Sequence, residues 1–261
     1  MCGSSDEGLG MTVSSNPQAQ HYDRILDDYD RHYYDPDSLQ YRERFILKPL
    51  LEGLALGGKR VADLASGSGE TSLYLTRRFP GIQLSGFDVS PEACRRYESR
   101  VGAPARQLDL TLGEYDGPTF DAAIIMGGLH HCAKHLPETL QTIGRMLAPG
   151  GTLLMFEPNR DYFLEPARQF WYGRDHYFDQ DAEAALSHDD LLKAGAGAFE
   201  SERLQYFGGP AFFLIYNSLV LRVPHSVKAH ISPALMSAEA LYGRLPMRWA
   251  LASFLARWTR R

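Results

Sequence analysis

One stretch of the chain decides the fold: VADLASGSGET, residues 61–71. Its apolar first half predicts a buried strand, and the glycines at positions 67 and 69 predict a tight loop. A helix is predicted at 71–79, directly after the loop. Unpaired N–H groups at the start of such a helix favour the anionic end of a ligand, for example a carboxylate.

The pattern of strand and helix continues beyond this unit. Apolar runs predict strands at 61–65, 82–87, 105–110, 122–126 and 152–156, and helices are predicted at 71–79, 91–101 and 136–147. Strands that alternate with helices indicate βαβ units around a parallel sheet, with right-handed crossovers that place helices on both faces. The chain of 261 residues, 44% of them apolar, has ample material for such a core.

Composition excludes several classes of protein. A net charge of −5 argues against a nucleic-acid binder. Three cysteines without a C-x-x-C pair argue against a disulfide scaffold or a zinc ribbon and favour a reducing compartment. The first 23 residues contain no Lys or Arg and no apolar core, so we expect no secretory signal and a cytoplasmic location. The longest apolar run, 211–221, is too short to span a bilayer.

The charge is unevenly distributed. Residues 221–261 contain seven Lys or Arg against one acid, Glu239, so this tail carries +6 and the first 220 residues carry −11. We expect helices at 233–242 and 246–260, the second with tryptophans between arginines. Such a tail suits docking onto the acidic body or onto a homodimer partner, and it also suits peripheral contact with a membrane.

Three carboxylates follow predicted strands. Asp63 lies before the glycines, Asp88 ends the second strand nineteen residues after Gly69, and Asp109 lies near the end of the third. An acid at position 88 suits the two hydroxyls of a ribose. Ser72 stands where a dinucleotide fingerprint needs its third glycine, which counts against NAD.

Further motifs follow in order: Phe120-Asp121, Gly127-Gly128-Leu129-His130-His131, Pro149-Gly150-Gly151 and Glu157-Pro158-Asn159. Singly they indicate only caps and turns. Together they resemble the class I S-adenosylmethionine-dependent methyltransferases, the small-molecule branch in particular, over about residues 60–159. The resemblance implies a Rossmann-like, mostly parallel seven-stranded sheet with S-adenosyl-L-methionine as the cofactor.

The resemblance also assigns cofactor-binding residues. Residues around the methionine part would be Asp63, Ala65, Ser66, Gly67 and Gly69; the ribose would lie on Asp88; the adenine would lie beside Val89, Asp109 and Leu110; and Gly127 would pass close to the sulfonium. Ala65 departs from the family, which usually has glycine at that position.

These inferences divide the chain as follows: a disordered tail at 1–17, N-terminal helices at 18–58, the cofactor-binding core at 59–159, an aromatic-rich cap insertion at 160–186, the remainder of the sheet at 187–224, and a basic helical extension at 225–261. Within the fourth and fifth segments we expect a helix at 187–198, with Ser187 and Asp190 as a capping pair, and a strand at 202–207.

The acceptor is expected to be a small molecule, methylated at a hydroxyl. His131, and after it His130, could act as general base or orient the acceptor, although a packing role is equally compatible. No metal is expected, because adjacent histidines do not converge on one ion. Candidate acceptor-binding residues are Tyr33, Glu157, Asn159, Trp171 and Tyr172. Glu157 could instead cap a helix, and the aromatic residues could simply form the core of a subdomain.

Three other functions remain open from the sequence. The same fold methylates carbon or nitrogen, an NAD-dependent oxidoreductase could use the glycine loop and Asp88, and a non-enzymatic protein could retain the cofactor fold.

Overall fold

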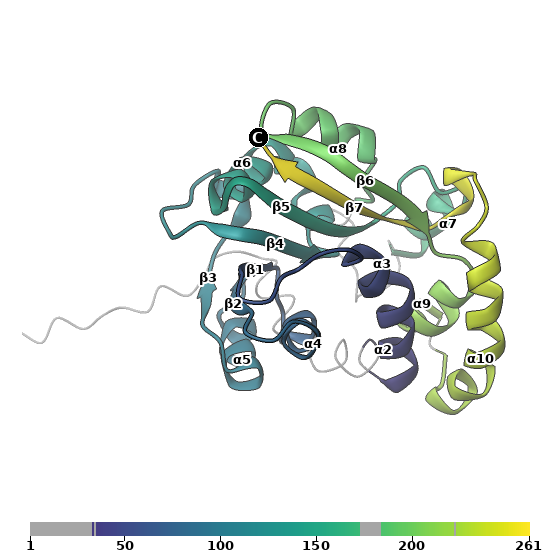
Figure 1. Ribbon diagram of the computed structural model, residues 1–261. Coiled ribbons are helices and arrows are strands. Elements are labelled where there is room, and N and C mark those ends of the chain that lie inside the picture. Colours follow the sequence, from purple (N-terminus) through teal and green to yellow (C-terminus); the bar gives the residue numbers. More distant parts are fainter. Residues whose placement is uncertain (1–32, 34, 173–183, 222) are drawn as a thin grey trace, which may run out of the picture.

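The computed structural model describes residues 33, 35–172, 184–221 and 223–261. At its centre lies a seven-stranded sheet in the order β3-β2-β1-β4-β5-β7-β6 (Figure 1). The strands are β1 (Arg60–Leu64), β2 (Gln83–Asp88), β3 (Ala105–Gln107), β4 (Phe120–Met126), β5 (Leu147–Pro158), β6 (Phe199–Phe207) and β7 (Ser253–Arg260). Strands β1 to β5 pair in parallel, and β7 is antiparallel to both β5 and β6. The prediction of a mostly parallel seven-stranded sheet is confirmed.

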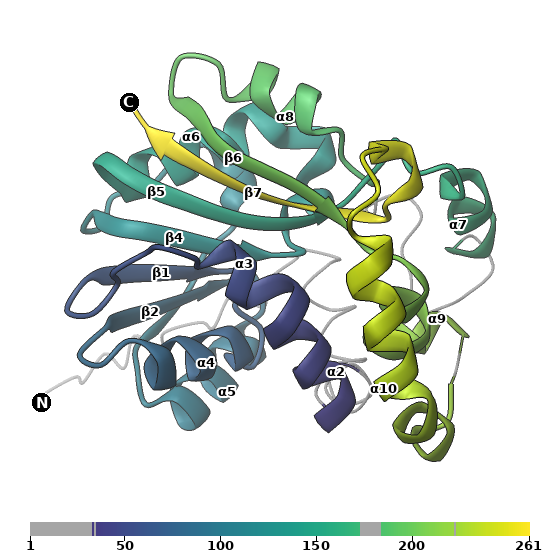
Figure 2. The same cartoon turned by 45° about the vertical axis from the view of Figure 1, so that its right-hand side comes forward.

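Helices cover both faces of the sheet (Figure 2). One face carries α2 (Pro36–Arg42), which continues through the π-helical turn η1 (Glu43–Leu47) into α3 (Lys48–Leu50), together with α4 (Glu70–Arg78) and α5 (Pro91–Val101). The other face carries α6 (Leu136–Met146) and α8 (His188–Ala194). Alternate residues of the central strands serve the two cores: Ile124 and Leu154 lie in the first, and Ile125 and Leu153 in the second.

The remaining elements gather at the ends of these strands. They are η2 (Leu110–Leu112), η3 (Leu129–His135), α7 (Glu165–Tyr172), η4 (Phe212–Tyr216), α9 (Ser218–Leu221), α10 (His225–Tyr242) and η5 (Arg248–Ala250). The third strand is shorter than predicted because Asp109 caps η2, where its carboxylate accepts from the Thr111 N–H at 2.9 Å and from the Thr111 hydroxyl at 2.6 Å. Of the segment 18–58, where N-terminal helices are predicted, residues 18–32 and 34 lie outside the described residues.

The prediction of a helix at 246–260 is wrong. Most of that segment is β7, which runs between β5 and β6 and pairs with both. Phe254, Ala256 and Trp258 alternate along the strand and fill one core, while Leu255 lies in the other. Apolar residues at these spacings fit either a helix or a strand, and only the gap between β5 and β6 decides.

Because the C-terminal segment is strand β7, it does not form the helix that peripheral membrane contact would need. Phe254 and Trp258 are fully buried, so the C-terminal segment is no amphipathic helix for a lipid surface. Within the described ranges, no helix has the length and apolar character needed to cross a bilayer.

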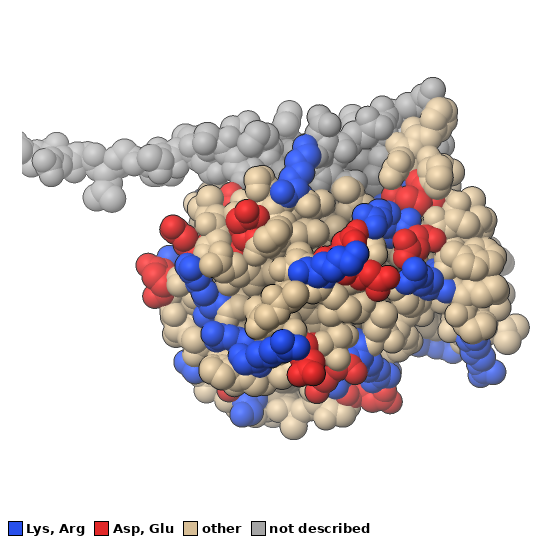
Figure 3. Space-filling view, turned by 90° about the horizontal axis from the view of Figure 1, so that it is seen from above, with Lys and Arg blue, Asp and Glu red and all other residues tan. Residues whose placement is uncertain are grey.

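The basic tail docks onto the rest of the chain. Arg257 Nη2 donates to the carbonyl oxygens of Leu50 at 2.9 Å and Glu52 at 2.8 Å. Arg248 forms ion pairs with Asp161 at 3.4 Å and Asp189 at 3.1 Å. On the face shown in Figure 3, acidic and basic side chains are interspersed and form no single-sign patch. Intramolecular docking therefore accounts for these two cations of the tail.

Helix α8 begins as predicted but without the predicted capping pair. Ser187 is the N-cap residue, yet its side chain makes no capping hydrogen bond. Asp190 instead pairs with Arg160, 2.6 Å away. An ion pair to a neighbouring loop has replaced the local contact that the sequence spacing predicted.

Helix α10 lies beside α2 at the carboxyl ends of the parallel strands (Figure 2), and two buried charges hold it there. Lys228 donates to Ser38 Oγ at 2.6 Å and Ser218 Oγ at 3.0 Å, and it pairs with Asp35. At the far end, Glu239 accepts from the Tyr41 hydroxyl at 2.7 Å and from the N–H groups of residues 209 and 211. Because these charges are hydrogen-bonded, their burial is tolerated.

The position of β7 predicts losses of stability of different size when each of two tryptophans is replaced. Trp258→Ala should lower the free energy of unfolding by about 3–5 kcal/mol, because a fully buried indole is lost from the core. Trp249→Ala is the matched control, because 51% of that side chain is exposed, and we expect a loss of under ~1 kcal/mol. Urea unfolding of both variants measures the difference, and equal losses would contradict the burial of β7.

Candidate functional site

The loop after β1 and the end of β2 form one hydrogen-bonded unit. Gly67 and Gly69 have φ angles of 51° and 87°, a region that favours glycine. The N–H of Gly67 donates to Asp88 Oδ2 at 2.9 Å, and the N–H of Ser90 donates to Asp88 Oδ1 at 2.9 Å. These contacts hold Asp88 in place, and a carboxylate has about four acceptor sites, which suits a pair of hydroxyls.

The surface of this loop has room for a ligand. A Cβ placed on Gly67 would meet no atom within 4 Å. The Ser66 hydroxyl is buried and has no hydrogen-bond partner among the described residues. A buried hydroxyl of this kind ordinarily finds a partner, so the loop fits a polar ligand lying against it.

Asp63 lies beneath the loop, where it is fully buried. It accepts from the Ser72 hydroxyl at 2.7 Å, and Ser72 Oγ lies 2.7 Å from the hydroxyl of Tyr97. Burial raises the pKa of Asp63 to about 7, and the hydrogen bond from Ser72 partly offsets that rise. Ser72, at the position of the missing third glycine, thus serves as the partner of Asp63.

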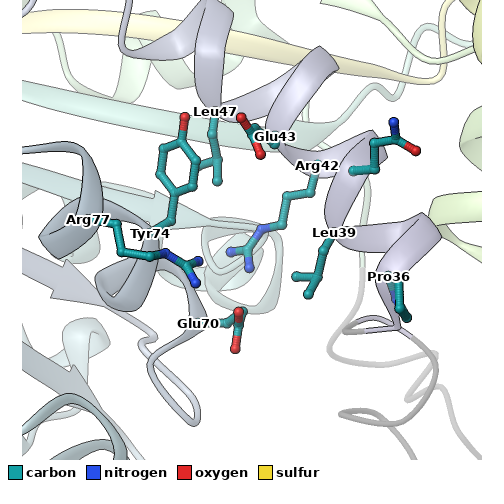
Figure 4. A pocket seen from close by; sticks show the side chains of 9 residues that line it. Pro36, Leu39, Arg42, Glu43, Leu47, Glu70, Tyr74 and Arg77 are labelled. Atoms are coloured by element: carbon teal, nitrogen blue, oxygen red, sulfur yellow. The ribbon is translucent and has the colours of Figure 1, made fainter.

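Arg42 is a residue that the sequence analysis missed. Its guanidinium is buried against the first turn of α4, where Nη2 donates to Thr71 Oγ1 at 2.5 Å. Arg42 and Arg77 point toward each other across a cavity of about 370 Å³ between α2 and α4 (Figure 4). An arginine in a predicted helix carries no local signal for this role, because only packing of α2 on α4 brings it to the glycine loop.

The turn after β4 lies beside the glycine loop, at the carboxyl ends of the parallel strands. Gly127 has a φ of 72°, and a Cβ placed on it would lie 3.7 Å from His130 Cε1 and 3.8 Å from Phe156 Cε1. A Cβ on Gly128 would lie 2.7 Å from the methyl carbon of Ala65, so the turn packs against the glycine loop. The segments that carry Asp88, Gly67 and Gly127 therefore meet at one edge.

Glu157 fixes this turn from β5. The fully buried carboxylate accepts from the N–H groups of Gly128 at 3.1 Å, Leu129 at 2.8 Å and His130 at 3.2 Å. Its Oε2 also lies 2.8 Å from His130 Nδ1. Of the two roles expected for Glu157, capping a helix is the one seen here, at the start of η3.

Burial favours the neutral form of both side chains, Glu157 and His130. It raises the pKa of Glu157, and the three backbone N–H groups oppose that rise. It lowers the pKa of His130, and Arg168 acts in the same direction. N–H groups that can only donate favour the ionised carboxylate, and burial favours a neutral imidazole.

His131 has a different environment. Its ring lies against that of His130, with 3.9 Å between the ring centroids and a tilt of 39° between the ring planes. Within the described part of the chain, no three His, Cys, Asp or Glu side chains are grouped so that they could hold a metal ion.

The other predicted cofactor residues lie around Asp88. Val89 follows it directly, and the Val89 carbonyl accepts from Gln107 Nε2 at 3.0 Å. Asp109 caps η2 as described above, and Leu110 is buried beside it.

The predicted acceptor residues separate into three groups. Tyr33 is buried and its hydroxyl donates to Asn217 Oδ1. Asn159 does not face an acceptor, because its amide donates to the carbonyl oxygens of Arg248 at 2.9 Å and Leu251 at 2.8 Å and anchors η5. Trp171 and Tyr172 end α7, and their side chains lie outside the described part of the structure.

Aromatic side chains pack against one another next to this edge. Tyr216 contacts Tyr33, Tyr41 and Phe156 with ring centroids 5.5–6.1 Å apart. The cluster continues through Phe207, Phe212 and Phe213. Aromatic residues from β5, β6, η4 and α2 therefore form an apolar wall at the carboxyl ends of the strands.

Ala65 generates a stability prediction. It is the only non-glycine residue among those described with a positive φ, 49°, which costs roughly 1–2 kcal/mol for an L-residue. Ala65→Gly should raise the free energy of unfolding by about 0.5–1 kcal/mol, after the added flexibility of the unfolded chain is subtracted. Ala238→Gly, at an exposed position inside α10, should lower it by about 1 kcal/mol. A loss of stability in Ala65→Gly, measured by urea unfolding, would contradict the strained backbone.

The buried Asp63 predicts a dependence of stability on pH. Its pKa rises from 3.8 to about 7 in the folded state, so between these values the folded chain binds a proton that the unfolded chain releases. The free energy of unfolding should therefore fall as pH rises through this window, by up to about 1.4 kcal/mol per pH unit. Asp63→Asn should remove that contribution. Parallel slopes for the two proteins in urea unfolding at pH 5, 6 and 7 would contradict the prediction.

The sequence around this edge is similar to known methyltransferases. Residues 61–151 match a family model described as a methyltransferase domain. The chain is 39% identical over 106 residues to a demethylmenaquinone methyltransferase from Thermus thermophilus, a match that covers 38% of this chain and 47% of that protein. It is 31% identical over 103 residues to a phthiotriol/phenolphthiotriol dimycocerosates methyltransferase from Mycobacterium leprae, covering 38% and 37%. These matches span less than half the length of the curated relatives.

Solved structures share the fold over most of the chain. The N-methyltransferase NodS from Bradyrhizobium japonicum, solved with S-adenosyl-L-homocysteine, has a TM-score of 0.60 at 15% identity, covering 94% of this chain and 99% of that one. The [4+2]-cyclase SpnF has a TM-score of 0.63 at 18% identity, covering 93% and 95%. Identities this low establish the fold alone. Residues 61–151 therefore match a methyltransferase domain, and the chain as a whole shares the fold of these solved structures.

Proposed function

We propose that the chain transfers a methyl group from S-adenosylmethionine to a small apolar acceptor, with a hydroxyl oxygen as the leading target. One observation carries the proposal: the carboxyl ends of β1, β2 and β4 bring the glycine loop, Asp88 and Gly127 to one edge. Ligands of open α/β sheets lie in the crevice outside these strand ends.

The residues of this edge suit the separate parts of the cofactor. Asp88 would hold the ribose hydroxyls, and Val89, Asp109 and Leu110 would border the adenine. The start of α4, with its free N–H groups, would receive the carboxylate, and the guanidinium of Arg42 lies beside that turn. Asp88 places negative charge near a cofactor that carries a sulfonium and an ammonium group.

The chemistry requires mainly positioning. The cofactor supplies a methyl group on a good leaving group, so the protein has to align the acceptor with the S–CH₃ bond. A hydroxyl acceptor also has to lose its proton, and the two histidines of η3 lie at the correct edge. Of the two, His130 has the contact with Glu157, so it replaces His131 as our leading candidate for the base.

The aromatic wall favours an apolar acceptor. An acceptor at the strand ends would lie next to the buried rings of this cluster, and apolar surroundings of this kind favour apolar or aromatic molecules and exclude water. The names of the two relatives, which refer to demethylmenaquinone and to phthiotriol dimycocerosates, agree with this choice. Methylation of carbon or nitrogen is the alternative in the same fold.

A panel of acceptors tests the proposal. The purified chain should bind S-adenosylmethionine and its demethylated product in calorimetry, should not bind NAD, and should add one methyl mass to an apolar phenol or alcohol. Asp88→Ala should weaken cofactor binding by tenfold or more, because the carboxylate that would hold both ribose hydroxyls is lost.

Glu92→Ala is the matched control for Asp88→Ala, because that acid is paired with arginines on the surface of α5. Binding of NAD in place of the sulfonium cofactor would overturn the proposal. Methyl transfer confined to amines or to carbon would shift it to the alternative acceptor. Cofactor binding without turnover on any acceptor would indicate a binding protein.

A further inference from the structure

We propose that Glu157 is a positioning residue that holds His130 in the tautomer with hydrogen on Nδ1 and leaves the Nε2 lone pair directed toward the acceptor. The role of that lone pair as a base rests on the proposed function, whereas the tautomer itself does not.

The geometry around the carboxylate leaves little choice of proton position. Oε1 accepts from the N–H groups of Gly128 and Leu129, and Oε2 accepts from the N–H of His130. Three backbone N–H groups that donate to the two oxygens stabilise the ionised carboxylate over the acid and oppose the rise in pKa that burial causes. Nδ1 lies 2.8 Å from Oε2, and beside such a carboxylate it has to carry hydrogen in order to bond.

The opposite nitrogen of the ring lies outside the contact with Glu157. Nε2 of His130 has no hydrogen-bond partner among the described residues, and 17% of the side chain is exposed. The ring edge at Cε1, next to Nε2, lies 3.7 Å from the Cβ position of Gly127, which is the residue expected beside the sulfonium. The tilted contact with the ring of His131 packs against one side of the His130 ring and restricts its rotation.

The charged groups around the ring come from three elements. Glu157 faces it from β5, and Arg168 of α7 acts on it electrostatically and is itself paired with Glu165 at 2.8 Å. His131 belongs to the same helix, η3, as His130. Arg168 disfavours a charged ring at rest, whereas the carboxylate of Glu157 stabilises the imidazolium once it has formed.

In the proposed methyl transfer, His130 takes up the one proton that the acceptor loses. The hydroxyl proton of the acceptor passes to Nε2, and an oxygen lone pair forms the new O–CH₃ bond. The S–CH₃ bond breaks and its electron pair stays on sulfur, which gives a neutral thioether. His130 becomes an imidazolium beside the Glu157 carboxylate and later returns the proton to water.

Substitution of Glu157 by Gln separates positioning from simple packing. An amide keeps the shape and can still accept from two backbone N–H groups, but its NH₂ donates to Nδ1 and transfers the ring hydrogen to Nε2. Nitrogen-15 NMR of the histidine side chains should show the Nδ1–H tautomer for His130 in the wild-type protein and the Nε2–H tautomer in Glu157→Gln. The expected fall in kcat is about 10²–10⁴-fold, with the Kd for S-adenosylmethionine changed less than threefold.

Three further variants control the result. Glu157→Asp keeps the charge at a shorter reach and should recover part of kcat. Glu157→Gln added to His130→Gln should cost almost nothing more, because both act through one ring. Glu239→Gln changes another buried glutamate that accepts two backbone N–H groups, and it should leave the His130 tautomer unchanged.

Several results would overturn the inference. They are an Nε2–H tautomer in the wild-type protein, an unchanged tautomer in a folded Glu157→Gln variant, and additive losses in the double variant. If Glu157→Gln does not fold, the wild-type tautomer and Glu157→Asp decide. If no acceptor is methylated, the proposed function fails, while the NMR measurement still decides the role of Glu157.

Discussion

The buried carboxylate of Glu157 is the contact on which the site depends. It receives the N–H groups of three consecutive residues where the chain leaves β4, and so it sets the direction in which that chain turns. The turn places Gly128 against Ala65 of the neighbouring loop and His130 against Gly127. A charge without water is tolerated only when its hydrogen bonds are satisfied, so this arrangement is closely specified.

The parallel sheet explains why distant motifs converge. Strand β1 lies between β2 and β4, and β5 follows β4, so the ends of all four strands share one edge. Small residues then allow close packing at that edge. Tyr97 of α5 lies against both Gly69 and Gly86, where a Cβ would come within 2.9 Å of its ring or closer. The glycines therefore serve the packing of helix on sheet as well as access for a ligand.

Local patterns predicted the central strands, their helices and the glycine loop, because periodicity and turn residues act over a few positions. Residues with long-range partners were not predictable in this way. The segment around Trp258 became a strand because β5 and β6 leave a gap for it. Arg42 reached the glycine loop, and Asn159 turned to η5, through contacts separated by 29 and 92 residues. For Glu157 the sequence left two roles open, and only the packing of β5 beside β4 shows which groups its carboxylate meets.

A crystal structure with S-adenosyl-L-homocysteine would test the central claim most directly. We predict that the ribose hydroxyls lie on the Asp88 carboxylate, that the sulfur lies beside Gly127, and that Nε2 of His130 faces the space where the methyl group would be. A ligand bound away from the carboxyl ends of β1, β2 and β4, or a His130 ring turned so that Nε2 meets Glu157, would contradict it.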